Sequence, residues 1–552
     1  MRHWTPSLAM PFVLLSLTLG ALPAVAGADH EEHQHAGSGP LGKVHFEVSC
    51  GADQQAAFDR AVALLHSFGY EQAAAAFHEI AAARPDCGMA YWGAAMSDFH
   101  QVWGPPSDVE WARGLAAAEK AKQVGARSER ERDWIAALGA YYLESSPRSH
   151  PQRVAAYSQA MEVLAAKYPQ DHEAQIFDAL AILAVAYNSP PDKTYARQKR
   201  AAAILSRELK DQPEHPGIAH YMIHSFDYPE LAPLALDAAR AYAKIAPAAP
   251  HALHMPSHIF TRLGLWQDSI ASNLASAETA RAIAAKAHPG ATSFDGLHAM
   301  DYLEYAYLQT ARDQEARGVL DGVAQAKSFD VPNFAAGYAL AAVPSRYALE
   351  RRAWADAAGL APAPASFPWE KFPYAEAIVH FARAVGAARS GDLGTARSAL
   401  TRLSTIESGL QGQKGFDWAT QVKIQRLAAA GWIAHAERKD DDALHSLQAA
   451  ADLEDTTDKH PVTPGSVLPA REQLGDLYAL LGKPREALQA YERSLETAPA
   501  RYNSLLGAAE AAAKLGDGAR ARAFYERLAS LCAGSTSERA ELARQRLEGI
   551  AK

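Results

Sequence analysis

REQLGDLYALLGKPREALQAYERSLETAP, residues 471–499, is the stretch that most clearly indicates the fold class of this sequence. Its small, aromatic and leucine positions have the spacing of two antiparallel helices joined by a short turn: Leu474, Gly475, Tyr478, Leu481, Gly482, Ala487, Tyr491 and Pro499. A small residue lets two helices cross closely, and an aromatic ring fills the adjoining hole. The final proline ends the second helix. The segment therefore predicts a helical hairpin.

The same spacing recurs along the chain. A shift of 34 residues places three of these positions on residues of the same type, at Gly516, Ala521 and Tyr525. Far upstream, the spacing of a second helix reappears at Tyr70, Ala73, Phe77 and Pro85. Helical hairpins closed by proline or polar turns are predicted at residues 127–168, 171–213, 216–247, 250–283 and 295–325. Strand patterns are nearly absent, so an all-α repeat protein is expected.

On these residues the chain resembles the tetratricopeptide repeat (TPR) superfamily over most of its length. It is also similar to large exported bacterial repeat proteins of no established activity that carry the segments LLHSF, AYWG and HMPSHIF. The resemblance implies an α-solenoid of antiparallel helical hairpins, the TPR superhelix. Because such solenoids are chiefly binding scaffolds, it implies a protein or peptide partner in the concave groove rather than a particular reaction.

The remaining sequence divides the chain into segments. Arg2, the apolar residues 10–22 and the small residues 24–26 predict a signal peptide, and hence a soluble periplasmic or secreted protein. The proline-rich stretch 360–373 cannot continue a helix. The predicted order is a signal peptide (1–26), a His-rich flexible segment (27–44), an N-terminal TPR-like solenoid (45–359), a proline-rich connection (360–373) and a C-terminal TPR domain (374–552).

Composition limits the partners. Lys and Arg number 54 against 63 Asp and Glu, a formal net charge of −9, which argues against nucleic acid. No later stretch is apolar for long enough to span a membrane. Of the three cysteines, Cys50 and Cys87 form either one disulfide, as an oxidising compartment permits, or two buried thiols, while Cys532 stays alone.

Histidines are concentrated in one part of the chain. Eight of the 22 lie within residues 215–298. His220 and His224 are four residues apart, as are His254 and His258, and the two pairs are offset by 34 residues. Each pair is therefore expected on one face of a first helix, at the same level of neighbouring hairpins that line the groove.

His251, His298 and Asp301 extend this set of candidate ligands. The resulting metal site would use His220, His224, His251, His254, His258, His298 and Asp301. Imidazole nitrogens suit Zn, Cu or Fe. No cysteine lies near these residues in the sequence, so a thiolate centre is not expected. Outer partners that fix the rings are expected among Asp227, Tyr302 and Tyr305. Pro256 interrupts the second pair and can kink its helix, so His251 and His254 need not share a face with His258.

Weaker histidine signals lie elsewhere. His66 and His100 are also 34 residues apart and either extend the groove site or cap helix ends. His30, His33 and His35 form a metal-scavenging tail or a solvated linker.

Three functions remain open at this point. The first is a metal-binding repeat protein coupled to partner or substrate recognition. The second is a metalloenzyme, a hydrolase or oxidase, with Asp301, Tyr302 or Glu304 as the nearest base or redox partner. The third is a metal-free interaction scaffold.

Overall fold

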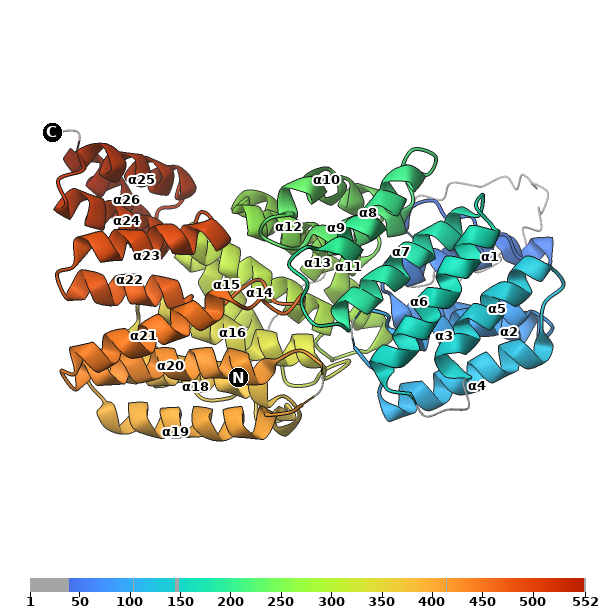
Figure 1. The fold of residues 1–552 in the computed structure, drawn as a ribbon, viewed down its shortest axis with the longest axis horizontal. Coiled ribbons are helices and arrows are strands. Elements are labelled where there is room, and N and C mark those ends of the chain that lie inside the picture. The colour runs from blue at the N-terminus through green and yellow to red at the C-terminus, as the bar shows by residue number, and fades with distance from the viewer. Residues whose placement is uncertain (1–38, 103, 144–147, 414, 551–552) are drawn as a thin grey trace, which may run out of the picture. The chain divides into compact units, whose positions relative to one another are not determined.

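The computed structural model describes residues 39–102, 104–143, 148–413 and 415–550. Within these ranges the regular structure is helical, and the only β interaction is an isolated bridge between Thr292 and Phe329. The expected all-α solenoid of antiparallel hairpins is confirmed (Figure 1). The predicted signal peptide and the histidines at 30, 33 and 35 lie outside the described residues.

The helices before the histidine-rich region pack one after another along the chain. They are η1 (Ala52–Gln54), α1 (Gln55–His66), α2 (Tyr70–Ala83), α3 (Gly88–Phe99), α4 (Asp108–Val124), α5 (Glu129–Tyr142), α6 (His150–Lys167), α7 (His172–Tyr187) and α8 (Ala196–Glu208). Serine side chains accept a hydrogen bond from the third helical residue at the start of α4 and α5, which stabilises these ends.

The central helices carry the histidines. They are α9 (Pro216–Phe226), η2 (Ala232–Ala235), α10 (Leu236–Ile245), α11 (Pro250–His254), α12 (Pro256–Leu263), α13 (Trp266–Ala287), α14 (Phe294–Gln309) and α15 (Asp313–Ala324). Proline occupies the first position of α9, α11 and α12, where its fixed φ and missing N–H suit a helix start. Figure 1 shows α9, α11 and α12 close together in the green part of the chain.

The rest of the described chain is again helical. Its elements are α16 (Phe334–Glu350), α17 (Trp354–Ala358), η3 (Trp369–Lys371), α18 (Pro373–Ser390), α19 (Leu393–Leu410), α20 (Trp418–Ala436), α21 (Asp440–Asp455), α22 (Ala470–Leu480), α23 (Pro484–Thr497), α24 (Tyr502–Lys514), α25 (Gly518–Leu531) and α26 (Glu538–Ile550). The predicted hairpins correspond to α5–α15, whereas α16 and α17 were not predicted. Across the proline-rich stretch 360–373, which holds only η3, α16 packs against α18.

Small residues allow the close helix crossings that the sequence pattern predicts. A Cβ atom at Gly507 would lie 2.3 Å from the ring of Tyr491, and one at Gly475 would lie 2.8 Å from the same ring. In the N-terminal part, a Cβ atom at Gly93 would lie 2.3 Å from the ring of Phe77. A larger side chain at these positions would push neighbouring helices apart.

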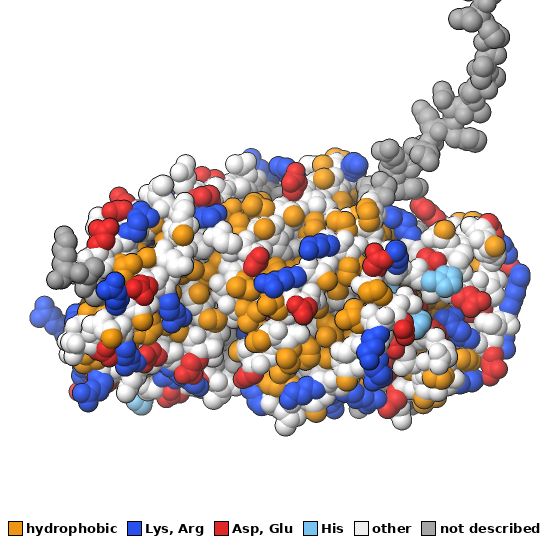
Figure 2. All heavy atoms as spheres, turned by 90° about the horizontal axis from the view of Figure 1, so that it is seen from above, with side chains coloured by type: hydrophobic (Ala, Val, Ile, Leu, Met, Phe, Trp, Pro, Cys, Tyr) orange, Lys and Arg blue, Asp and Glu red, His pale blue; other side chains and the backbone are white. Residues whose placement is uncertain are grey.

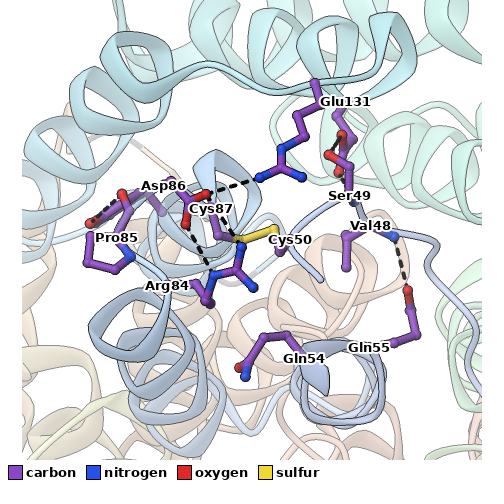
Figure 3. Close-up of a disulfide and its surroundings, with 12 residues drawn as sticks. Val48, Ser49, Cys50, Gln54, Gln55, Arg84, Pro85, Asp86, Cys87 and Glu131 are labelled. Carbon is purple, nitrogen blue, oxygen red and sulfur yellow. Dashed lines mark hydrogen bonds and ion pairs between the residues drawn. A yellow bond between two sulfur atoms is a disulfide. The ribbon is translucent and has the colours of Figure 1, made fainter. Parts of the chain in front are cut away.

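A disulfide joins Cys50 to Cys87 (Figure 3). It links the segment before α1 to the residue before α3, so the two-thiol alternative is wrong. Cys532 is a buried free cysteine. None of the described helices combines the length and apolar character that crossing a bilayer requires.

Candidate metal centre

Three histidines from α9 and α11 meet in what we call the first histidine group: His220, His224 and His251. One ring nitrogen from each lies within 4.8 Å of the others. The Nε2 atom of His220 is 3.1 Å from the Nε2 atoms of both His224 and His251. All three side chains are buried.

The second histidine group consists of His254, His258 and His298, from α11, α12 and α14. Its ring nitrogens also lie within 4.8 Å of one another, and all three residues are buried. The Nε2 atoms of His254 and His258 are 3.0 Å apart. The rings of His254 and His298 are tilted by 50° to each other, with centroids 4.1 Å apart.

Met255 separates the short helix α11 from α12, between the two histidines of the second pair. Pro256 begins α12, so the helix that starts at Pro250 ends at His254. His254 and His258 still face each other across this break, while His251 turns toward α9. The four-residue pairs thus lie together as predicted, but the six histidines form two groups rather than one.

A hydrogen bond fixes the tautomer of His220 in the first group. Nδ1 of His220 lies 2.6 Å from the carbonyl oxygen of His66, which can only accept, so this nitrogen carries the hydrogen. In a neutral ring the other nitrogen then bears a lone pair, so Nε2 of His220 presents a lone pair to His224 and His251. The hydroxyl of Tyr187 lies 3.2 Å from the carbonyl oxygen of His224 and 3.3 Å from its Nδ1 atom.

The second group is held in the same way. Nδ1 of His254 donates to Oδ1 of Asn273 at 2.7 Å, and the amide nitrogen of Asn273 donates to the carbonyl of Ser269, which fixes the amide orientation. Nδ1 of His258 donates to Oδ2 of Asp227 at 3.1 Å. The hydroxyl of Tyr302 lies 3.2 Å from the same nitrogen. The facing Nε2 atoms again carry lone pairs.

Burial keeps these rings neutral. It lowers the pKa of His224 to about 3 and holds the pKa values of His220, His251, His254 and His298 well below the usual range. In the second group no imidazolium proton then bridges the Nε2 atoms of His254 and His258, so their lone pairs 3.0 Å apart repel one another. Two ligands bound 2.0–2.1 Å from a tetrahedral ion lie about 3.3 Å apart. A cation between the nitrogens would therefore turn repulsion into coordination.

Asp227 is the carboxylate that accepts a hydrogen bond from His258 of the second group. Burial raises its pKa, but Lys459 and Arg262 outweigh burial and hold the pKa of Asp227 well below its usual range. Arg262 donates to Oδ1 at 2.8 Å and Lys459 to Oδ2 at 3.1 Å. Asp227 thus remains ionised and orients His258, which is the outer role predicted for it. Lys459 was not predicted.

A third group surrounds Glu173. His66 and His215 direct Nε2 atoms at its two carboxylate oxygens, at 2.9 and 3.0 Å, and all three residues are buried. Nδ1 of His66 lies 2.8 Å from the hydroxyl of Tyr221. These contacts are ordinary hydrogen bonds between rings and a carboxylate, so the third group supports the first group through the His66 carbonyl. His100 belongs to none of the three groups among the described residues.

Several predicted participants lie elsewhere. Asp301 is not a member of either histidine group, because its carboxylate pairs with Arg346. Tyr305 receives a hydrogen bond from Arg501. Glu304 is buried and neither carboxylate oxygen has a hydrogen-bond partner in the described chain; burial raises its pKa well above the usual range.

The histidines do not line an open groove. Their exposed fractions run from 0% for His220 to 7% for His224 and His251, and the Phe68 ring packs 4.3 Å from that of His220. On the face seen in Figure 2, histidine is visible at only a few places among hydrophobic and charged side chains. The expectation that these histidines line an open groove is wrong, because their side chains are buried beneath neighbouring residues such as Phe68.

In the comparison with known proteins, no family model matches and no curated protein matches. Among solved structures the chain is similar to yeast Tom70 (13% identity, 90% of this chain and 95% of that one, TM-score 0.32). It is also similar to a tetratricopeptide repeat protein from Parabacteroides merdae (12%, 55% and 99%, 0.30). Human IFIT1, as a dimer with m7Gppp-AAAA, matches at 13% identity over 81% of this chain and 90% of that one, with a TM-score of 0.36.

Proposed function

We propose that this helical-repeat protein binds a transition metal through its two histidine groups. The observation that carries the proposal is the 3.0 Å contact between the Nε2 atoms of His254 and His258, two rings whose Nδ1 atoms are both used as donors. Each group offers imidazole nitrogens alone, a donor set that suits Zn, Cu, Fe or Ni. The second group adds carboxylate and amide partners behind its rings, an arrangement typical of metal-ligating histidines.

The scaffold supports a binding role. Stacked helical hairpins are chiefly surfaces for protein or peptide partners, so we propose that metal binding is coupled to recognition of a partner or substrate. Export agrees with the Cys50–Cys87 disulfide, because disulfides persist in oxidising compartments. N-terminal sequencing of the protein from a fractionated cell would test cleavage near residue 26.

A metalloenzyme is the second candidate. Three protein ligands leave a fourth position open on a tetrahedral ion, as catalytic sites require. The hydroxyl of Tyr302, 3.2 Å from Nδ1 of His258, lies beside the second group and can exchange a proton or an electron.

The test is the metal content of untagged protein, measured by mass spectrometry. We expect bound metal in the wild type and a clear loss in His254→Ala/His258→Ala. The matched control, His172→Ala/His288→Ala, removes two partly exposed histidines that pair with glutamates, and it should keep the metal. All proteins carry His30→Ala/His33→Ala/His35→Ala, so that N-terminal histidines do not contribute. A metal-free wild type that also fails to load in vitro would refute the proposal.

A further inference from the structure

The two histidine groups are neighbours because one short helix supplies both. His251 and His254 are three residues apart on α11, and His251 joins the first group while His254 joins the second. Residues three apart on a helix have Cβ atoms about 5–6 Å apart. The two rings lie with centroids 6.4 Å apart. Any ion held by one group therefore lies close to an ion held by the other.

The ligands of the two groups supply no negative charge to balance two divalent ions. The imidazoles are neutral, and the Asp227 carboxylate is already paired with Arg262 and Lys459. The Glu173 carboxylate is hydrogen-bonded to His66 and His215. Two dications close together in a buried site repel strongly. An anionic oxygen ligand shared between their open coordination positions lowers that repulsion.

We propose that the two histidine groups hold two copper ions as one coupled centre, bridged in the Cu(II) form by a small oxygen anion such as hydroxide. This inference rests on the proposed function and adds the number, identity and coupling of the ions. Among divalent first-row ions, copper binds nitrogen donors most tightly. With three ligands to each ion, both ions keep an open position for the bridge.

The test is a titration of the full chain, in the His30→Ala/His33→Ala/His35→Ala background, with Cu(II). Electron paramagnetic resonance and copper analysis are recorded together. We expect about two copper ions per chain. As the second equivalent binds, the signal per copper should fall several-fold, because the two unpaired electrons couple through the bridge. This measurement needs no substitution in the site, so misfolding cannot obscure it.

Variants assign the coupling to the groups. His220→Ala/His224→Ala and His254→Ala/His258→Ala should each bind about one copper with a full, uncoupled signal, while helical circular dichroism shows that they fold. Two coppers in the wild type with the summed signal of independent ions, or a single copper, would overturn the coupled centre and leave the proposed metal binding intact. No copper and no other metal in the wild type would overturn both.

Discussion

Two repeats of the molecule use the same helical positions for different chemistry. When the turns Leu263–Gly264 and Leu481–Gly482 are aligned, His254 and His258 correspond to Glu472 and Asp476. Glu472 is buried and accepts two hydrogen bonds from Arg501, both at 2.9 Å. Asp476 accepts from Tyr491 at 2.7 Å and from Arg352 at 2.9 Å.

The difference lies in how the polar atoms are satisfied. In the C-terminal repeat both carboxylates at these positions accept a hydrogen bond from an arginine. In the histidine repeat the Nδ1 atoms of His254 and His258 donate to Asn273 and Asp227, and their Nε2 atoms face each other 3.0 Å apart. The first repeat balances its charges within the chain, whereas the cation that we propose would occupy the second. The predictions below test that contrast.

The largest effect is expected from Glu472→Ala. It removes one of the two carboxylates that pair with the fully buried Arg501 and leaves Glu350 as the other, and removing one partner of a buried ion pair costs about 3–5 kcal/mol. Urea unfolding measures the loss. In metal-free protein, His254→Ala should cost clearly less, because it also relieves the repulsion with His258.

One outcome would contradict the comparison between the two repeats. Equal losses for the two variants in the presence of a chelator would mean that His254 is a structural residue like Glu472. The control is Glu492→Ala, which removes an exposed partner of Arg520 and should change stability by less than about 1 kcal/mol.

The disulfide should matter nearly as much, but for a reason unrelated to the site. Cys50 and Cys87 are 37 residues apart, and closing a loop of that length removes about 4 kcal/mol of unfolded-state entropy at room temperature. Cys50→Ser/Cys87→Ser should therefore lower the free energy of unfolding by about that amount, measured by urea denaturation, while copper stoichiometry stays unchanged. Loss of metal in this variant would show that the N-terminal hairpins hold α9 in place.

Bound metal should raise the stability of the folded protein, and the gain should depend on the histidine groups. A ligand at about 100 times its Kd stabilises the folded state by about 2.7 kcal/mol. Thermal unfolding of the wild type with and without Cu(II) should show this gain, and His254→Ala/His258→Ala should lose part of it. Glu492→Ala should keep all of it. A gain that persists in a variant lacking both four-residue pairs would place the ion elsewhere.

The sequence predicted the hairpins well because their packing is local. Gly475, Tyr491 and Gly507 lie within one repeat and its neighbour, so their spacing is visible in the sequence. The helix α16 was missed because it contains Pro344, which normally argues against a helix interior.

Only part of the candidate site could be predicted from the sequence. The four-residue pairs followed from spacing, and Asp227 was one of the expected outer partners. Lys459 was not expected, because it reaches Asp227 across 232 residues of sequence. The division into two groups depends on which ring each histidine faces, since His251 faces His220 and His254 faces His258, and spacing alone does not specify this. Asp301 had the right spacing, but Arg346 from the next helix pair occupies its carboxylate.

Taken per pH unit, the smallest expected effect is on the pH dependence of the metal-free protein. Burial lowers the pKa of His224 to about 3, whereas an unfolded histidine titrates near 6.5. Between these values the unfolded chain binds the extra proton, so His224 contributes stability above pH 6.5 that is lost as the pH falls toward 3. In this window His224→Gln should flatten the fall by about 1.4 kcal/mol per pH unit, measured by urea unfolding with a chelator present. His172→Gln, which removes a half-exposed ring paired with Glu208, is the matched control. If the two variants had the same slope, the imidazole of His224 would be protonated in the folded protein, and the facing nitrogens could then share a proton without any cation.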